Sequence, residues 1–293
     1  MSILFNTAGT WYKGNLHMHT TNSDGSLSPQ AAAALYKKAG YDFIALTDHW
    51  VQSENVKDDG FLFLSGCEWD TGDMVRSAIF HIIGVGMERQ VLLKKDLSRN
   101  PQVIIDAINE AGGIAILAHP AWSVTDPEDG LALSGLSGAE IYNSFSGLPW
   151  NGRRADSSLY FDLWANRGRA AGCFAADDCH VYGGEQTKSY IMVNAPELTA
   201  NAVKKSITEG NFYASQGPVF QNVRINGNAV EVDCSEVESV VFYTNTVWCG
   251  DRVCSGSVTT ASYRIKSTDR YVRVELVDRD GNMAWTAPFF VNQ

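Results

Sequence analysis

Short apolar runs alternate with amphipathic segments through the first two thirds of the chain. Runs of strand length occupy residues 11–16, 42–46, 61–65, 78–85, 114–118, 139–142 and 172–175. Segments with the apolar spacing of helices follow several of them, at residues 30–39, 101–111, 157–166 and 201–207. Ser28 and Pro29 supply start signals for the first helix, and Gly40 supplies its stop signal. Short strands alternating with helices predict a parallel α/β architecture.

Histidines and carboxylates gather at the ends of these predicted strands. An open doubly wound sheet collects its site at one switch point, which only two or three strands feed. In this chain, more than three predicted strands end in candidate histidines or carboxylates. A closed barrel brings all of its strand ends to one opening. The pattern therefore favours a barrel, with the open sheet as the alternative.

The histidines carry the strongest chemical signal. His17 and His19 follow a strand at spacing i, i+2, so in an extended backbone both imidazoles point to one side. The chain has six histidines, none after residue 180, and the other four occupy similar positions: His49, His81, His119 and His180. Imidazole is a preferred ligand of transition metals, so the distribution indicates a metal centre. Unrelated structural histidines are the alternative.

The pattern changes at residue 218. Alternating or β-branched runs occupy residues 239–244, 257–265 and 270–277, with hairpin signals at 226–228 and 280–282. We therefore expect an α/β domain over residues 1–217 and a small all-β, sandwich-like domain over residues 218–293. Trp248 and Trp285 are expected in the core of the second domain, because such residues are usually buried.

Composition narrows the class of protein. The formal net charge of −10 argues against the basic face of a general nucleic-acid binder, although a nucleotide or short oligonucleotide is compatible as a substrate. No window reaches the length of apolar sequence that a membrane span requires, and the first residues lack the features of a signal peptide. We expect a cytoplasmic protein with no membrane partner. The oligomeric state is left open.

The cysteines predict no separate metal site. The six cysteines include no C-x-x-C pair, which argues against a zinc knuckle. Cys67 and Cys173 lie in apolar runs and are expected in the core. Cys249 and Cys254 are close enough in sequence for a disulfide, but in the cytoplasm we expect them to be reduced.

Taken together, the motifs resemble those of the PHP (polymerase and histidinol phosphatase) family over residues 11–216. In order they are His17-Met18-His19 with Asp24-Gly25, Thr47-Asp48-His49, Gly66-Cys67-Glu68, Phe80-His81-Ile82-Ile83-Gly84, Ala118-His119-Pro120 and Asp178-Cys179-His180. Gly217-Pro218 resembles the close of this module in stand-alone phosphoesterases, including relatives of carbaryl-hydrolase-like metallohydrolases. The resemblance implies a distorted (βα)7 barrel with a trinuclear metal site.

The resemblance also implies three sets of ligands, with catalytic roles for Glu68, His81 and Asp178. The first set is His17, His19, Glu68 and Asp178. The second is Glu68, as a bridge, with His81 and His119. The third is Asp24, His49 and His180. Two to three divalent ions, manganese, zinc or iron, are expected, and the oxygen of Asp24 favours manganese, iron or magnesium in the third set.

Neighbouring residues are expected to support this centre. Asp48 and Asp177 are placed to orient imidazole N–H groups. A phosphate ester also needs fixed positive charge, and arginine is its preferred bidentate partner. Arg153 and Arg154, in a polar loop, are the candidates for binding it, with Arg76 a weaker one. Either of the first two arginines is also consistent with a solvated loop charge.

The expected function is hydrolysis of a phosphate ester. Two ions that share a carboxylate can share a water, whose lowered pKa gives a hydroxide able to attack phosphorus. The substrate is expected to be a small phosphorylated metabolite or a nucleotide. One alternative is a hydrolase of carbamates, esters or amides that uses the same ions. A second is a metal-stabilised binding module with little turnover.

Overall fold

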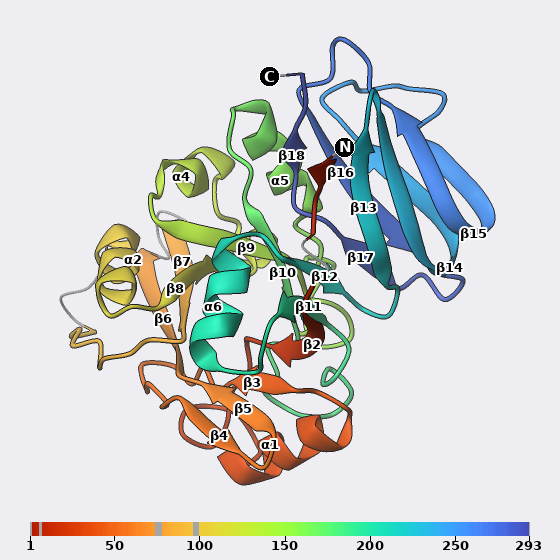
Figure 1. Cartoon of the computed structure of the whole chain (residues 1–293). Helices are drawn as coiled ribbons and strands as arrows, with labels where there is room; N and C mark the ends of the chain where they lie inside the picture. The colour runs from red at the N-terminus through yellow and green to blue at the C-terminus, as the bar shows by residue number, and fades with distance from the viewer. Residues whose placement is uncertain (1, 6–7, 74–77, 96–99, 293) are drawn as a thin grey trace.

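Two parts make up the chain in this computed structural model, which describes residues 2–5, 8–73, 78–95 and 100–292. A mixed α/β part occupies the lower left of Figure 1, and strands alone form the part at the upper right. The two parts share one long sheet, and a second sheet lies wholly within the α/β part. The sheets determine where the candidate ligands meet.

The smaller sheet carries the middle of the chain, in the strand order β10-β9-β8-β7-β6. Its strands are β6 (Gly66–Asp73), β7 (Ala78–Val85), β8 (Ile114–Leu117), β9 (Leu136–Asn143) and β10 (Gly172–Ala176). The last three are parallel, whereas β7 runs antiparallel to both β6 and β8. The expectation of parallel strands throughout is therefore wrong at β7. An apolar run shows that a strand exists but not its direction.

The longer sheet contains the start of the chain. In the α/β part its strands, in spatial order, are β12 (Phe212–Ser215), β11 (Tyr190–Ala195), β2 (Thr10–Asn15), β3 (Phe43–Ala45), β5 (Phe61–Leu64) and β4 (Val56–Asp58). β2, β3 and β5 are parallel. The sequence pattern did not predict β4, β6, β11 or β12 as separate strands, because turn signals do not bound all of these short runs.

Two isolated bridges link the ends of the two sheets. Met18, just after β2, bridges to Cys179, just after β10, and His49, after β3, bridges to Glu68 in β6. Both bridges lie within the candidate ligand motifs. The fold is therefore a mixed α/β structure that brings strand ends together. The described pairing forms two sheets and not one closed ladder, so the (βα)7 barrel stays a prediction.

The expected helices are present, the first of them with its predicted start signal. They are α1 (Pro29–Lys38), α2 (Pro101–Glu110), α5 (Ser158–Asn166) and α6 (Ala200–Thr208). The Ser28 hydroxyl accepts a hydrogen bond from the Ala31 amide at 3.2 Å, which caps α1 as expected. Two short helices that the pattern did not predict, α3 (Pro120–Ser123) and α4 (Pro127–Ala132), follow β8.

The second part contains only strands among its regular elements. They are β13 (Phe220–Asn226), β14 (Ala229–Tyr243), β15 (Val253–Arg264), β16 (Tyr271–Val277), β17 (Met283–Trp285) and β18 (Phe289–Phe290). This agrees with the expected all-β character. β1 (Ser2–Ile3) pairs with β13, so the first residues of the chain join the β part. The boundary at residue 217 stays a prediction.

Strand β17 connects the two parts, because it pairs with β16 on one side and with β12 on the other. Trp285 on this strand is fully buried, as expected, but it packs into the core of the α/β part and not into that of the second domain. Its ring stacks on Tyr142 with centroids 5.6 Å apart. A second connection is the buried Arg273, whose Nη2 lies 2.8 Å from Asp162 Oδ2 on α5. The interface thus combines a shared ladder, an aromatic stack and a buried ion pair.

Other expectations for side chains are confirmed in part. Cys67 and Cys173 are buried, and Cys249 and Cys254 are free. The expectation for Trp248 is wrong: its side chain is 83% exposed, because it lies in the loop between β14 and β15, beyond the alternating pattern of the strands.

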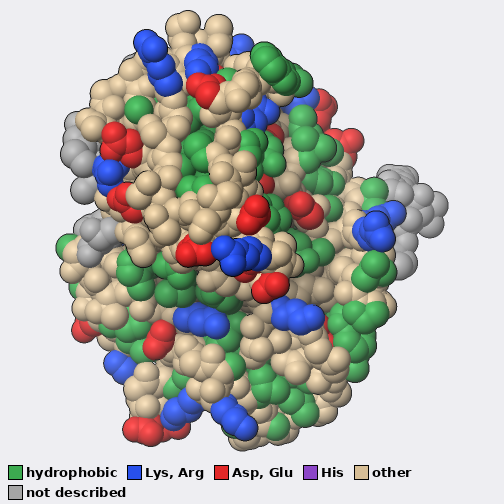
Figure 2. Space-filling model, turned by 90° about the vertical axis from the view of Figure 1, so that its right-hand side faces the viewer, with side chains coloured by type: hydrophobic (Ala, Val, Ile, Leu, Met, Phe, Trp, Pro, Cys, Tyr) green, Lys and Arg blue, Asp and Glu red, His purple; other side chains and the backbone are tan. Residues whose placement is uncertain are grey.

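Acidic and basic side chains are interspersed on the face shown in Figure 2. Within the described ranges, no helix has both the length and the apolar character needed to cross a membrane.

The buried and the exposed tryptophan provide a matched test of this interface. Trp285→Ala should lower the free energy of unfolding by about 3–5 kcal/mol, because it leaves a cavity between the two parts. Trp248→Ala should change it by less than about 0.5 kcal/mol, since that side chain contacts mainly solvent. Urea denaturation followed by circular dichroism measures both. Similar small losses in the two variants would contradict the assigned interface.

Candidate metal centre

The two histidines after β2 lie at the centre of the site. His17 and His19 flank Met18, whose bridge to Cys179 keeps the backbone extended beyond the end of the strand. Alternate residues of an extended chain point to one side, which places the two Nε2 atoms 3.3 Å apart. Both side chains are fully buried. The geometry that the spacing predicted is therefore present.

Glu68 lies between two groups of imidazoles, and each of its oxygens faces a different group. Its Oε2 lies 3.1 Å from His19 Nε2 and 3.3 Å from His17 Nε2. Its Oε1 lies 2.8 Å from His81 Nδ1 and 3.5 Å from His119 Nε2. Antiparallel pairing of β6 with β7 puts Glu68 and His81 diagonally opposite on one face. A carboxylate so placed can bridge two cations.

Asp178 completes the first group from the end of β10. Its Oδ1 lies 3.0 Å from His19 Nε2 and 3.1 Å from His17 Nε2. The backbone of Asp178 has φ 54°, and His119 has φ 26°. Non-glycine residues adopt positive φ at a cost of about 1–3 kcal/mol, and such residues cluster at functional sites. Two candidate ligands therefore sit on strained backbone.

The third group lies nearer to solvent. Asp24 Oδ2 is 3.6 Å from His180 Nε2 and 3.8 Å from His49 Nε2, and the Asp24 side chain is 54% exposed. His19 Nδ1 lies 3.5 Å from Asp24 Oδ1, so His19 touches this group as well as the first. The predicted third set therefore gains a fourth member. This group is the most exposed of the three.

The structure thus brings all nine predicted ligands into three adjoining groups. Within each group the ligand atoms lie within 4.8 Å of one another. Their role as ligands stays a prediction, but the surroundings fit a cation. Asp178 Oδ1 and His49 Nδ1 are buried without a well-formed hydrogen bond to any described residue. Buried polar atoms left in this state are destabilising unless an ion or water satisfies them.

The charges of the cluster point the same way. Burial alone lowers the pKa of His17, but the adjacent carboxylates, Asp178 first, outweigh burial and raise that pKa well above its usual range. The same balance between burial and the carboxylates raises the pKa of His19 to about 9. Burial opposes ionisation of Glu68, yet His17 and the other imidazoles hold its pKa well below its usual range. Positive charge is thus favoured here, whether protons or metal ions supply it.

Glu140 is a component of the site that the sequence reasoning missed. This buried residue on β9 accepts a hydrogen bond from His17 Nδ1 at 2.8 Å, which turns His17 Nε2 toward Glu68. Its other oxygen accepts the amide N–H of His119 and the side-chain amide of Asn143, each at 2.8 Å. The sequence contained one signal for this role, because Glu140 is a single acidic residue within an apolar strand. Carboxylates that hold ligating imidazoles in this way orient them and strengthen metal binding.

The expectation for Asp48 and Asp177 is wrong, because neither accepts a hydrogen bond from an imidazole in the described structure. Asp48 accepts hydrogen bonds from the amide and hydroxyl of Thr20, each at 2.7 Å, and from the Ser23 hydroxyl. Asp177 accepts the Tyr36 hydroxyl at 2.7 Å and the amide N–H groups of residues 187–189. Both carboxylates fix the loops that carry ligands and not the ligand rings themselves.

The predicted phosphate-binding arginines lie on the surface. Arg153 and Arg154 are exposed in the segment between β9 and α5. Burial and Asp126 raise the pKa of Tyr160, and the charge of Arg154 partly offsets them. The Tyr160 hydroxyl donates to the carbonyls of Thr125 at 2.8 Å and Pro120 at 3.2 Å. Pro120 directly follows His119. Arg76 lies outside the described residues.

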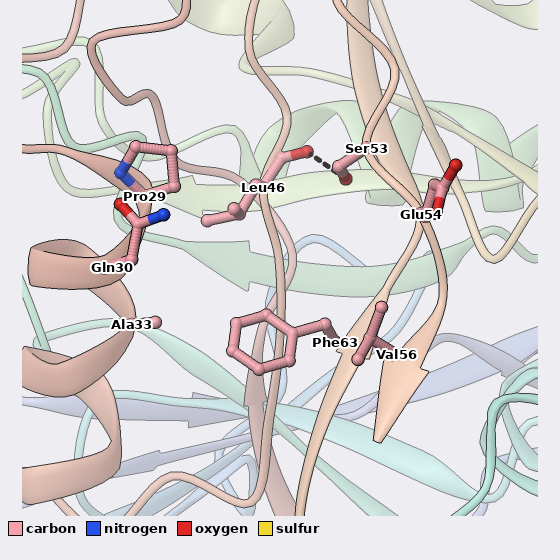
Figure 3. Close-up of a pocket in the computed structure, with 8 residues that line it drawn as sticks. All are labelled: Pro29, Gln30, Ala33, Leu46, Ser53, Glu54, Val56 and Phe63. Carbon is pink, nitrogen blue, oxygen red and sulfur yellow. Dashed lines mark hydrogen bonds between the residues drawn. The ribbon is translucent and has the colours of Figure 1, made fainter. Parts of the chain in front are cut away.

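An apolar pocket of about 290 Å³ opens elsewhere on the α/β part. Figure 3 shows Pro29, Gln30 and Ala33 of α1 facing Phe63 and Val56 across it. None of the nine candidate ligands lines this pocket. It is therefore distinct from the metal centre.

Comparison with known proteins supports the fold. A two-domain protein from Bacteroides vulgatus, described as containing a predicted PHP-like metal-dependent phosphoesterase, matches 99% of this chain and 98% of its own with a TM-score of 0.55 and 15% identity. An amidohydrolase from Chromobacterium violaceum is more distant: it covers 59% of this chain and 89% of its own, with 17% identity and a TM-score of 0.39.

Sequence comparison adds little to this. An uncharacterised protein of Methanocaldococcus jannaschii is 28% identical over 145 residues, which cover 45% of this chain and 82% of that protein. No family model matches the chain. The Bacteroides comparison shows that the chain has the fold of a two-domain PHP-like protein, which confirms at the level of the fold the resemblance that the motifs carry. Similarity to carbaryl-hydrolase-like proteins stays a prediction.

The position of Glu140 leads to a prediction about metal affinity. Glu140→Gln preserves the shape of the side chain but removes the charge that holds His17, so manganese affinity should fall about tenfold to a hundredfold. Titration calorimetry on the chelator-treated protein measures this change. Glu197→Gln, an exposed glutamate outside the site, is the matched control and should bind as the wild type does. Unchanged affinity in Glu140→Gln would refute the assigned role.

Proposed function

We propose that this protein is a metal-dependent phosphoesterase that hydrolyses a small phosphorylated metabolite or a nucleotide. The observation that carries the proposal is Glu68, a buried carboxylate whose two oxygens face separate groups of imidazoles. A structural metal site is typically closed at four ligands and needs no bridge to a second ion. A bridging carboxylate is typical of sites in which two ions act on one substrate.

The side chains of the cluster could provide ligands for two to three divalent ions. Manganese, zinc or iron suits their mixture of imidazole and carboxylate donors. His17, His19 and Asp178 would hold one ion, and His81 and His119 a second. Bound there, such ions supply the Lewis acidity that makes water nucleophilic near neutral pH and offsets charge on phosphoryl oxygens. Glu68 would be a ligand at both ion positions, and Glu140 fixes the orientation of the His17 ring.

The outer group defines the side on which the substrate binds. Asp24, His49 and His180 are partly exposed, whereas His17, His19 and Glu68 are buried. A phosphate group entering from solvent meets the outer group first. We assign binding of the remaining negative charge of a phosphate monoester to Arg154. Its charge acts on Tyr160, partly offsetting burial and Asp126, which raise the pKa of that residue, and the Tyr160 hydroxyl donates to the carbonyl of Pro120, next to His119. Arg153 has no comparable connection among the described contacts.

Hydrolysis of carbamates, esters or amides is the second candidate. In the part of the chain that the structure describes, no lysine or arginine forms an ion pair with the nine ligands. A neutral substrate would need no such cation, and the same ions can activate water for attack on a carbonyl carbon. A binding module without turnover has no specific observation in its favour.

A substrate screen separates these candidates. The manganese-loaded protein should hydrolyse at least one phosphate ester in a panel of phosphomonoesters, phosphodiesters, carboxylic esters and carbamates. Glu68→Gln should lower kcat by at least about a hundredfold, because it removes the charge shared by two ions. Arg154→Ala should lower kcat/KM for phosphomonoesters by roughly tenfold to a hundredfold, as expected for a charge-assisted contact.

Arg153→Ala is the matched control, since it removes the same charge from the adjacent position and should behave as the wild type. Both arginine variants should retain their metal. Turnover of carboxylic or carbamate esters alone would establish the second candidate. A protein that binds its ions yet turns over nothing in the panel would instead support a binding module. Near-normal turnover in Glu68→Gln would show that Glu68 does not act as the bridge.

A further inference from the structure

A continuous stack of rings leads outward from the buried part of the metal centre. His19 stacks on His180 with centroids 4.1 Å apart, and His180 stacks on Phe145 at 4.5 Å with an interplanar angle of 18°. Phe145 in turn stacks on Trp150 at 6.2 Å and 22°. The first of these rings is fully buried and the last two are only partly buried. The stack therefore runs from the ligands to the rim of the site.

The two outer rings are held in place by their loop. The Phe145 amide donates to the carbonyl of Asp177 at 3.1 Å, which ties the loop to the end of β10. The Asn151 side chain donates to the Phe145 carbonyl at 2.8 Å. At Gly183 an added Cβ would lie 2.7 Å from Trp150 Cη2, so only glycine lets the His180 segment approach the indole this closely. The rings form a preorganised surface.

A second aromatic residue borders the site from another element. Trp122 on α3 meets His119 edge-to-face, with centroids 4.9 Å apart, and His81 in the same way at 5.9 Å. It is half-exposed. Aromatic rings thus adjoin the cluster at the outer group, through Phe145, and at the second group, through Trp122. Imidazoles need hydrogen-bond partners to fix their orientation, and these rings supply none.

Exposed aliphatic side chains lie in the same segments. Val51, Val124, Leu148 and Val181 are between 42% and 62% exposed. Val51 and Val181 lie within two residues of ligands, and Leu148 lies within two residues of Trp150. A site that receives only a phosphate group needs no apolar border. Exposed apolar side chains around a few convergent polar groups are typical of pockets that hold an apolar part of a ligand.

We propose that Trp150, the ring at the outer end of this stack, selects a flat aromatic ring in the substrate, attached to the group that leaves on hydrolysis. The proposal rests on the proposed function and names a class of substrate for it. His180 belongs to the outer, partly exposed group, so the part of the substrate beyond the scissile bond lies on the side of the site where the stack ends at Trp150. An aromatic ring gains offset stacking there that an aliphatic ring of equal size does not.

The test compares two ligands that differ only in the character of the ring. They are 2-phenylethyl phosphonate and 2-cyclohexylethyl phosphonate, which resist hydrolysis, carry the same charge and have similar size. Titration calorimetry on the manganese-loaded wild type should give about fivefold tighter binding of the phenyl compound. In Trp150→Leu, which keeps apolar bulk, this preference should disappear. Trp150→Phe should retain most of it, and Trp248→Leu, the exposed tryptophan of the β part, should retain all of it.

Three results would overturn the proposal. Equal affinity of the wild type for both compounds would show that the surface does not recognise aromatic rings. A preference that survives in Trp150→Leu would place recognition elsewhere, with Trp122 as the next residue to replace. Equal weakening of both compounds in Trp150→Leu, together with loss of manganese, would mean that the stack only positions His180.

Failure of the proposed function gives a different result. If neither phosphonate binds to the loaded wild type, the neutral pair 3-phenylpropionamide and 3-cyclohexylpropionamide is titrated in the same way. A fivefold phenyl preference there, again lost in Trp150→Leu, would support the ring surface while contradicting a phosphoesterase. Absence of binding in both pairs would overturn both proposals.

Discussion

A single buried carboxylate, Glu68, sets the constraint on which the rest of the site depends. Its two oxygens face different groups of imidazoles, so the strands that carry those groups must meet within a few ångströms of one residue. Burying so much charge is destabilising unless opposite charge lies beside it. The cluster meets this condition with protons on its imidazoles or with metal ions, and metal ions fit the mixed donor set best.

The fold brings these strands together at the positions where its two sheets are in contact. One isolated bridge joins Met18 to Cys179 and the other joins His49 to Glu68, so each lies beside ligands from both sheets. Positive φ at His119 and Asp178 shows that the backbone is held away from its preferred conformation there. Glu140 then fixes the ring of His17 from β9.

Sequence reasoning predicted which nine side chains would lie together, because their spacing and motifs are local signals. Spacing i, i+2 in an extended segment was enough to orient His17 and His19, and the family motifs supplied the other positions. Glu140 was missed because its role depends on β9 lying beside His17 in space, which no spacing reveals. Asp48 was misassigned for the same reason. Strand direction at β7 and the exposure of Trp248 also depend on tertiary pairing, which an apolar pattern does not encode.

The central claim is that Glu68 bridges two metal ions, and anomalous diffraction from crystals of the manganese-reconstituted protein tests it most directly. The account predicts a separate anomalous peak on each side of the Glu68 carboxylate, one beside His17 and His19 and the other beside His81 and His119. A third peak beside Asp24 would mark the outer group. A single peak, or two peaks of which only one contacts Glu68, would contradict the account.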